Sequence, residues 1–446
     1  MAEALHAAWQ ASWSDFLHNR VALAERRVSG WLHMLPAALR DRSDADLLVT
    51  LADMAHIAGA AASDSVCLRA AVEAYDAHLA LAPQNVAALR MKAETLLRLR
   101  EYAAALDCFG EVYARSLADA PPPAAPPFQL EHDAECVEEA VRLGADPSHL
   151  FAAAAWRRLA AQMGGERCEA RPIDRSAAPH WGQPLPTPPQ HAAAAAWRGA
   201  PLRGSIDWAA AQAAYAASRL VVIDDLLDEA ALRAAQAYAR HGAHFRTARR
   251  GYLGCFPTDG LTHPLVLALV HALEAAAPAI FGRHTLALWW LFKYDESNAD
   301  GIGIHADPAA VNINLWLTDD EACLEGGGLA IYKHVPELGQ RTQSVNREFE
   351  DGEEAALREK LSAEGVVKVD YKCNRAVLFV SDQYHESLPF RFAPGYSNRR
   401  VNLTLLFGDR WSPEVGRKAS DDEAHSSDAG PRACPRADEA WDLFDT

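Results

Sequence analysis

GIGIHADPAAVNINLWLT, residues 301–318, places two metal-ligand side chains directly before an apolar stretch with the pattern of a β-strand. His305 and Asp307 are two positions apart, so on an extended chain both side chains point to the same side, where one cation can bind both. An imidazole nitrogen and a carboxylate oxygen suit a first-row transition metal, and one further histidine would leave coordination positions open. Because His-x-Asp also occurs by chance, this stretch alone predicts only a candidate site.

A second stretch, NRAVLFVSDQYHESLPFRFAPGYSNRRVNLTLLFG (residues 374–408), contains the further histidine. Its apolar run Arg375–Val380 predicts a strand, a turn follows, and His385 comes directly after the turn. An arginine pair, Arg399 and Arg400, opens the next predicted strand. Taken singly, these residues fit a turn histidine and an exposed strand edge. The order His-x-Asp, strand, histidine, arginine is a much rarer coincidence.

These ordered motifs resemble the iron(II)- and 2-oxoglutarate-dependent oxygenases, in particular the prolyl-hydroxylase-like branch of that superfamily. The resemblance covers residues 218–410, and it implies that the catalytic residues are the metal ligands His305, Asp307 and His385. It also implies Fe(II) as the metal, 2-oxoglutarate and O2 as co-substrates, and hydroxylation of a C–H bond as the reaction. Halogenases of the superfamily replace the carboxylate ligand by a small residue, so the presence of Asp307 favours hydroxylation over halogenation.

The same resemblance implies where 2-oxoglutarate binds. The string Arg-x-Asn-Leu-Thr at residues 400–404 resembles the penultimate core strand of the family, where an arginine pairs with the distal carboxylate of the co-substrate. The planar guanidinium can bind a carboxylate through two parallel N–H groups, which explains the use of arginine there. The resemblance therefore implies Arg400 as the anchor and Thr404 as a supporting hydroxyl, with Arg399 pointing to the other face.

Further positions are candidates for co-substrate binding. Tyr294 stands where prolyl-hydroxylase-like enzymes have a tyrosine in the co-substrate pocket, although a core aromatic residue would fit equally well. Asn312 and Asn314 share one face of their predicted strand with Trp316, so both amides reach the co-substrate or substrate if that face looks inward. The glycines at 326–328 occupy the place of a Gly-Gly-x-Leu turn in related enzymes.

The first 118 residues are rich in Ala and Leu at helical spacing. A period of 34 residues relates Ala71 to Ala105 and Tyr75 to Phe109, which are the small and aromatic positions of a tetratricopeptide repeat. The region resembles that family over two units, residues 52–85 and 86–119. Paired helices of this kind offer a surface on which a protein partner could dock.

The expected architecture is multidomain α plus β, with an N-terminal helical repeat region followed by a double-stranded β-helix (jelly-roll) oxygenase domain. Proline-rich stretches favour extended connectors and suggest that the helical region folds apart from the sheet domain. The expected parts are residues 1–118 (helical), 119–217 (Pro-rich connectors and helices), 218–411 (oxygenase domain) and 412–446 (disordered tail).

Several elements are predicted by residue range. Short β-rich runs separated by turns follow residue 218, as in a barrel or jelly roll. Residues 334–366 are interpreted as an insertion near the barrel mouth. Helices are expected at 131–143, 148–163, 192–217, 228–241 and 353–362, and strands at 219–227, 287–294, 311–318, 328–333, 366–371, 376–381 and 401–408.

Composition narrows the classes of partner and compartment. The formal net charge of −17 argues against binding to nucleic acid or to an anionic membrane. None of the eight cysteines forms a CxxC pair, which favours free thiols over a zinc ribbon or a disulfide framework. No signal peptide and no stretch of membrane-spanning length is recognised. We therefore expect a cytoplasmic protein with neither a nucleic-acid nor a membrane partner.

The class of substrate stays open at this point. A helical repeat region joined to a barrel favours a protein or peptide substrate, whereas a small molecule would leave the helices as a lid or dimerisation surface. Two other readings compete: a repeat scaffold whose barrel no longer turns over, and a cupin-like metal protein that uses no 2-oxoglutarate. The combination of both histidines, Asp307 and Arg400 argues against both.

Overall fold

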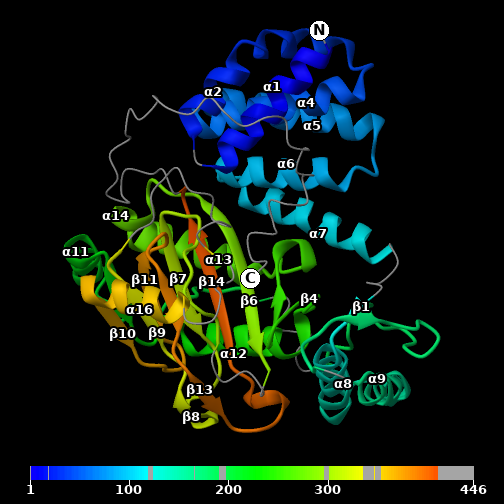
Figure 1. Cartoon of the computed structure of the whole chain (residues 1–446), viewed down its shortest axis with the longest axis vertical. Coiled ribbons are helices and arrows are strands. Elements are labelled where there is room, and N and C mark those ends of the chain that lie inside the picture. The colour runs from blue at the N-terminus through cyan, green and yellow to red at the C-terminus, as the bar shows by residue number, and fades with distance from the viewer. Residues whose placement is uncertain are drawn as a thin grey trace.

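The computed structural model describes residues 2–18, 20–118, 124–164, 166–189, 197–295, 301–334, 346 and 353–409. It has a helical N-terminal region and a sheet-rich C-terminal domain (Figure 1). The predicted disordered tail, residues 412–446, lies outside the described residues, as does much of the insertion at 334–366.

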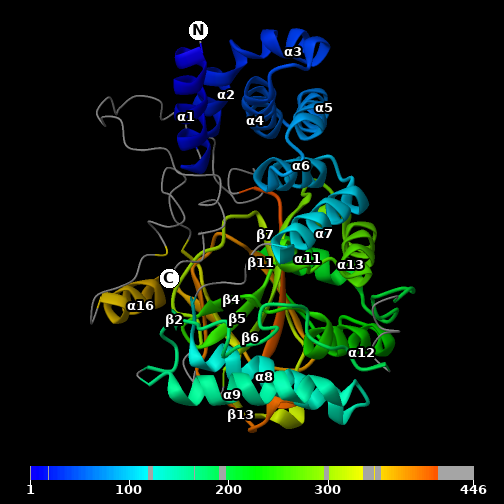
Figure 2. The same cartoon turned by 90° about the vertical axis from the view of Figure 1, so that its right-hand side faces the viewer.

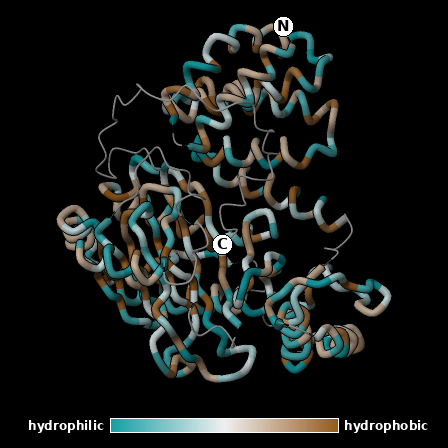
Figure 3. Tube along the Cα trace, viewed as in Figure 1, coloured by the Kyte–Doolittle hydropathy of each residue, from teal (hydrophilic) through white to brown (hydrophobic). Residues whose placement is uncertain are grey.

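The N-terminal helices form packed pairs in which hydrophobic and hydrophilic positions alternate along each helix (Figure 3). Asp44, Asp64 and Asn85 cap three of them, each accepting a hydrogen bond from a backbone N–H of the first turn. The helices are α1 (Ala2–Leu17), α2 (Val21–Ser29), α3 (Leu35–Asp41), α4 (Ala45–Ala62), α5 (Ser65–Leu81), α6 (Val86–Arg98) and α7 (Tyr102–Ala118). The predicted unit 86–119 coincides with α6 and α7, whereas α4 begins at its cap rather than at residue 52.

The helical region has two hydrophobic cores. One lies among α1 to α5 and is closed by Ala88 and Met91 of α6, whereas the other face of α6 and helix α7 share a continuous core with the sheet domain. The Phe109 ring packs edge-on against the indole of Trp289, with centroids 5.6 Å apart. The Tyr102 hydroxyl donates to Glu274 at 2.6 Å. The expectation that the helices to residue 118 fold apart from the sheet domain is therefore wrong for α6 and α7, because their apolar faces are part of its core.

Helix α4 contradicts the prediction that no stretch of the chain has the length of a membrane-spanning helix. Ala45–Ala62 is an 18-residue helix of mean hydropathy 1.3, which is long and apolar enough to cross a membrane. Of that window 61% is buried inside the structure, against the neighbouring helices, as in the central helix of a bundle.

The seven described cysteines are free, and Cys434 lies outside the described residues.

The middle region supplies helices α8 (Pro127–Arg142), α9 (Leu150–Gln162) and α11 (Trp208–Ser218), and α8 and α9 lie on one flank of the sheet domain (Figures 1 and 2). At the start of the predicted Pro-rich region 119–217 the chain is helical from Pro127, since proline is tolerated in the first turn of a helix. Its residues 124–125 form the short strand β1, which pairs with β2 (Arg171–Pro172). Of the helix expected at 192–217, residues 192–196 lie outside the described residues, and the described part from residue 197 is helical only from Trp208, where Asp207 caps it.

The sheet domain contains two main antiparallel layers. The large sheet has the order β3-β11-β7-β14-β6-β5-β4, and the small sheet has the order β10-β9-β12. The large sheet consists of β3 (Leu220–Ile223), β4 (Thr247–Arg249), β5 (Tyr252–Cys255), β6 (Leu286–Tyr294), β7 (Val311–Trp316), β11 (Ala376–Val380) and β14 (Val401–Phe407). The small sheet consists of β9 (Leu329–Tyr332), β10 (Val366–Val369) and β12 (His385–Ser387), and β8 (Cys323–Gly326) pairs with β13 (Phe390–Phe392).

The long predicted strands are confirmed, and so are the helices predicted at 131–143 and 148–163, which are α8 and α9. Two more predicted helices are also present. These helices are α12 (Glu229–Ala237), which continues as a π-helical turn, and α16 (Glu353–Glu364), which packs against β9 and β10. Strands β4, β5, β8, β12 and β13 and the helices α13 (Pro264–Ala276) and α14 (Pro278–Phe281) were not predicted. The missed strands are only three or four residues long and lack a clear apolar alternation.

The two faces of the large sheet differ in chemistry. On β14, Leu403 and Leu405 point into the main core, which also contains helix α13. The intervening residues Asn402 and Thr404 belong to the opposite face. On β7 the same alternation places Asn312 and Asn314 on the polar face, next to β14 through the pair Thr404–Asn314. This polar face looks toward the small sheet and carries the candidate site.

We expect the substitution Phe109→Ala to destabilise the sheet domain by about 3–5 kcal/mol, because it removes a large side chain from the shared core. Hydrogen exchange of a peptide spanning residues 286–294 should become faster. Tyr75→Ala is the matched control, since Tyr75 occupies the equivalent position one unit earlier but lies in the separate core. If both variants leave exchange in this peptide unchanged, the shared core does not contribute to the stability of β6.

Candidate metal centre

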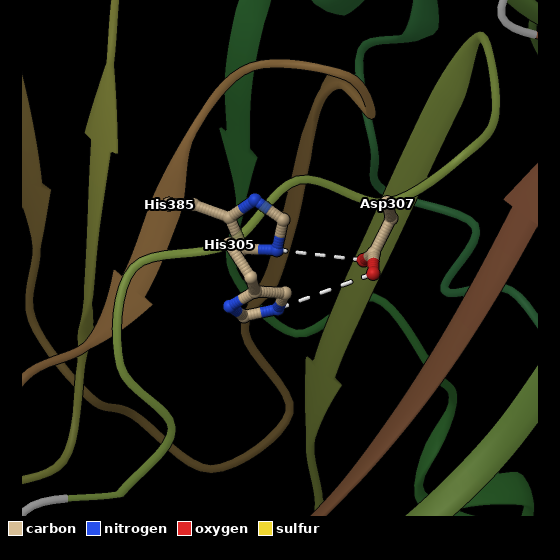
Figure 4. A group of neighbouring side chains, drawn as sticks. All are labelled: His305, Asp307 and His385. Carbon is tan, nitrogen blue, oxygen red and sulfur yellow. Dashed lines mark ion pairs between the residues drawn. The ribbon is translucent and has the colours of Figure 1, made fainter. Parts of the chain in front are cut away.

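Two segments that are far apart in the sequence meet at the candidate metal site. His305 precedes β7 and His385 opens β12, and their backbones form an antiparallel bridge with N–H to carbonyl distances of 2.9 and 2.8 Å. Asp307 comes two residues after His305 on the same segment. The three side chains converge as predicted (Figure 4), with all potential ligand atoms within 4.8 Å of one another.

The carboxylate lies opposite the two imidazoles. Asp307 Oδ2 is 3.4 Å from His385 Nε2, and Asp307 Oδ1 is 4.0 Å from His305 Nε2. The ring centroids of the two histidines are 4.2 Å apart. In this arrangement both Nε2 atoms and one carboxylate oxygen face a common point, as a single bound cation requires.

Hydrogen bonds on the far side of each imidazole fix which nitrogen is available. His305 Nδ1 lies 2.8 Å from the carbonyl oxygen of Gly303, and His385 Nδ1 lies 2.9 Å from that of Gln383. A carbonyl only accepts, so each Nδ1 carries the proton and each Nε2 keeps a lone pair for a metal. Burial, with a further contribution from the neighbouring His385, lowers the pKa of His305 to about 4, so its ring is neutral at pH 7.

Asp307 has one oxygen held and one unpaired. Its Oδ2 accepts a hydrogen bond from Asn312 Nδ2 at 2.8 Å, while Oδ1 has no hydrogen-bond partner in the described structure. The residue is only 1% exposed, and a buried carboxylate oxygen without a partner is costly unless a cation or donor satisfies it. The donor set, two imidazole Nε2 atoms and an unsatisfied carboxylate oxygen, therefore fits a divalent transition metal. Asn312, a candidate for co-substrate binding, thus also contacts this ligand through its Nδ2.

The second feature of the site is a buried arginine. Arg400 is 2% exposed, and among the described residues no carboxylate pairs with it. Its Nε and Nη2 donate to the carbonyl of Gly327 at 3.2 and 3.0 Å, and Nη1 lies 3.4 Å from Asn402 Oδ1. The guanidinium also lies over the Tyr294 ring, 4.5 Å from its centroid. A buried guanidinium without a counter-ion fits an anionic ligand such as a carboxylate.

A line of polar side chains extends from this arginine along the polar face of the large sheet. Asn402 Nδ2 and Asn314 Nδ2 both donate to Thr404 Oγ1, at 3.2 and 3.3 Å. Asn314 Oδ1 is buried without a hydrogen-bond partner in the described structure, so the line ends on an unused acceptor. The predicted residues Tyr294, Asn314, Arg400 and Thr404 are thus neighbours on this face.

A cavity of about 160 Å³ lies at the arginine end of the site. It is lined by Tyr294, Asp295, Phe390, Arg391, Phe392, Ala393, Arg399 and Arg400. The backbone at Gly326–Gly328 runs so close to neighbouring backbone that side chains would not fit, which explains the three glycines. Gly326 and Gly327 have positive φ angles of 65° and 83°, and a Cβ at Gly328 would lie 1.9 Å from the carbonyl oxygen of Val369.

Arg399 and Arg400 point to opposite sides, as predicted, but Arg399 is not on an exposed edge. Its Nη1 lies 3.2 Å from Asp295 Oδ1, and its Nη2 lies 2.8 Å from Glu135 Oε2 of α8. Arg167 also binds Asp295, at 3.1 Å. Arg399 is therefore part of a buried ion-pair network that attaches the middle region to the sheet domain.

A polar cluster beside His385 was not predicted. Arg358 of α16 binds Glu386 through two nitrogens, at 3.0 and 2.7 Å, and the Tyr332 hydroxyl donates to the same carboxylate. Arg358 also binds Glu354 one turn earlier on α16, at 2.7 Å. The pair Glu354 and Arg358, four positions apart on the predicted helix, was the available signal, but its partner on β12 could not be read from it.

Comparison with known proteins gives no family by sequence: no protein-family model and no curated protein matches the chain. Solved structures that resemble about half of it are iron- and 2-oxoglutarate-dependent oxygenases and related enzymes. The epimerase SnoN, in complex with Fe3+, alpha ketoglutarate and nogalamycin RO, is 15% identical over 51% of this chain and 95% of that chain, with a TM-score of 0.34.

Two further structures belong to the same group. HygX from Streptomyces hygroscopicus, with nickel and 2-oxoglutarate bound, is 11% identical over 45% of this chain and 87% of its own, with a TM-score of 0.30. A Pseudomonas putida prolyl-4-hydroxylase is 17% identical over 48% of this chain and 99% of its own, with a TM-score of 0.27. At these values the likenesses assign no activity to this chain, whose function is argued from its own residues.

Substituting any one of the three ligand residues should abolish metal binding. We expect His385→Ala or Asp307→Ala to remove measurable Mn(II) binding in isothermal titration calorimetry, because each deletes one of three protein ligands. His334→Ala is the matched control, since His334 is a half-buried histidine close to the site, and its imidazole pairs with Glu364 instead. Undiminished affinity in both ligand variants would contradict the proposed site.

The lowered pKa of His305 predicts a pH dependence of stability. The unfolded chain takes up a proton at this imidazole near pH 6.5, whereas the folded, metal-free protein does so only near pH 4. The stability conferred by His305 is therefore fully present above pH 6.5 and is lost as the pH falls to about 4, by up to about 3 kcal/mol. The unfolding free energy of His305→Gln, measured with chelator present, should fall less steeply over this window than that of the wild type.

Proposed function

We propose that this protein is an iron(II)- and 2-oxoglutarate-dependent dioxygenase that hydroxylates a C–H bond. One observation carries the proposal: the three-ligand site and the buried Arg400, which has no counter-ion among the described residues, are linked by polar residues of one sheet face. A metal site alone would fit many functions, including a cupin-like protein without 2-oxoglutarate. A buried cation on the same face adds a binding group for a dicarboxylate.

In this proposal the chain's own residues hold and orient the metal. His305, His385 and Asp307 provide three ligand atoms from one side, which leaves the opposite side for co-substrate and O2. Fe(II) bound there would supply the activation of O2 that is coupled to oxidative decarboxylation of 2-oxoglutarate. Asn312 keeps Asp307 turned toward the two imidazoles through its 2.8 Å hydrogen bond.

Arg400 would receive the distal carboxylate of 2-oxoglutarate. Gly327 and Tyr294 hold the guanidinium from two directions, one through hydrogen bonds and the other through its ring face. Thr404 and Asn314 would orient the co-substrate between the arginine and the metal. The aromatic cluster of Tyr252, Phe256, Trp290, Phe292 and Phe390, buried on the same side, would keep water from the reaction.

We also propose a topology for the two sheets, a repeat family for the helix pairs and a class of substrate. The large and small sheets would form a double-stranded β-helix, and the pairs α4–α5 and α6–α7 would be tetratricopeptide-like units. A protein or peptide substrate is favoured by these helix pairs beside the sheet domain, and a small molecule is the alternative. Incubating a cell extract with the enzyme, Fe(II) and 2-oxoglutarate, then searching proteins and metabolites separately for oxygen addition, distinguishes the two.

Turnover itself is tested without the substrate. The protein supplied with Fe(II), O2 and 2-oxoglutarate should convert 2-oxoglutarate slowly to succinate even when no substrate is present. Absence of succinate in the wild type, together with absence of any oxidised product in extract, would favour a scaffold with an inactive barrel.

The sharpest prediction concerns Arg400. Arg400→Lys keeps the positive charge but loses the planar pair of donors, so one charge-assisted hydrogen bond to the distal carboxylate should be lost. Such a bond contributes about 1.5–3 kcal/mol, which corresponds to a rise of about 10- to 100-fold in the dissociation constant of 2-oxoglutarate. Anaerobic titration of the Mn(II)-loaded protein measures this constant, and the affinity for Mn(II) should hardly change.

Arg391→Lys is the matched control, because Arg391 lines the same cavity but is largely exposed, near Glu325. Arg399→Lys is unsuitable, since it would disturb the buried pairs with Asp295 and Glu135. Equal 2-oxoglutarate affinity in the wild type and Arg400→Lys would remove the assigned anchor and favour the metal-only alternative.

A further inference from the structure

One side chain of the insertion holds the metal-binding segment directly. Asn346 is buried, and its carboxamide forms two hydrogen bonds with the backbone of Ala306. Its Nδ2 donates to the Ala306 carbonyl at 2.9 Å, and its Oδ1 accepts from the Ala306 N–H at 2.9 Å. Ala306 is the residue between His305 and Asp307, so both ligands are joined to the residue that Asn346 holds.

These two bonds complete the hydrogen bonding of the ligand segment. The N–H and carbonyl of His305 are paired with His385. The N–H of Asp307 donates to the Ser381 carbonyl at 3.2 Å, and the Asp307 carbonyl accepts from Ser381 Oγ at 3.3 Å. Ala306 in the middle is paired with a side chain instead of a strand. A carboxamide carries the same donor and acceptor as a peptide group, so Asn346 acts here as a single strand residue.

We propose that Asn346 is a positioning residue for the metal centre. By holding the Ala306 backbone, it fixes the directions in which the side chains of His305 and Asp307 leave the chain. The inference rests on the proposed metal site, because it concerns how two of the three ligands are placed. Residues that orient ligands in this way affect metal affinity without touching the metal.

The same insertion also reaches the third ligand. Helix α16 binds Glu386 through Arg358, which lies near the middle of the helix, and Glu386 directly follows His385. The helix also passes close to the first ligand segment, since a Cβ added at Gly303 would lie 3.0 Å from Glu354 Oε1. The described residues of the predicted insertion, Asn346 and helix α16, therefore contact both ligand-bearing segments.

The chain contains a matched control for Asn346. Asn374 is also buried, and its carboxamide forms the same double hydrogen bond with one backbone residue: Nδ2 donates to the Leu227 carbonyl at 2.8 Å, and Oδ1 accepts from the Leu227 N–H at 2.9 Å. It lies at the end of β11 remote from Ser381. Its φ of 61° makes replacement by alanine at least as destabilising as at Asn346.

The experiment compares Asn346→Ala with Asn374→Ala in the full chain. Asn346→Ala should lower the Mn(II) affinity measured by calorimetry by about 10- to 100-fold and change the visible absorption spectrum of bound Co(II). Asn374→Ala should lower the melting temperature but leave Mn(II) affinity and the Co(II) spectrum as in the wild type. A spectral change specific to Asn346→Ala supports positioning, because a general loss of stability does not alter ligand geometry.

Two results would overturn the inference while the metal centre stands: wild-type Mn(II) affinity in Asn346→Ala, or an equal loss of affinity in both variants. Failure of the wild type to bind Mn(II) would instead refute the proposed function. Should Asn346→Ala not fold, hydrogen exchange of the metal-free wild type decides. The Ala306 amide should exchange slowly because Asn346 accepts its hydrogen bond, and fast exchange would contradict the proposed role.

Discussion

Two backbone hydrogen bonds between His305 and His385 make the candidate site possible. They join the segment before β7 to the start of β12, and so they connect the large sheet with the small one. Both imidazoles are in turn bonded through Nδ1 to carbonyls of their own segments, at Gly303 and Gln383. The positions of the ligand atoms are therefore set by the backbone, whose hydrogen bonds are directional and satisfied. Side-chain packing alone would leave the rings free to rotate.

The charge balance around Arg400 depends on which carboxylates nearby are already paired with other arginines. Asp295 follows Tyr294 and could neutralise Arg400, but it is bound by Arg399 and Arg167 from the opposite side. A buried carboxylate held by two guanidinium groups has little to gain from a third. The network thus leaves Arg400 without a counter-ion among the residues that the structure describes. The middle region therefore helps to keep Arg400 available for a ligand, because its helix α8 contributes Glu135 to the same network.

The sequence predicted what depends on local pattern. The long strand β6 is a nearly continuous apolar run, β7 and the first half of β14 alternate apolar and polar residues, and the ligand triad follows from the order of motifs. The short strands β8 and β13 could not be predicted, because their stability comes from each other and not from local propensity. Asn346 gave no signal at all, since its role exists only when Ala306 is folded against it. The shared core of α6 and α7 was missed for a similar reason: a buried helix face does not reveal which partner covers it.

That shared core has a consequence for how the chain is made. Ribosomes synthesise α7 long before β6, and the Trp289 that covers Phe109 follows about 180 residues later. At typical synthesis rates of about 5–20 residues per second, the apolar faces of α6 and α7 stay uncovered for roughly 10–40 seconds. The helices α1 to α5 can complete their own core during this time. The second helix pair must wait, exposed to water or to a chaperone, until the sheet that completes it has emerged.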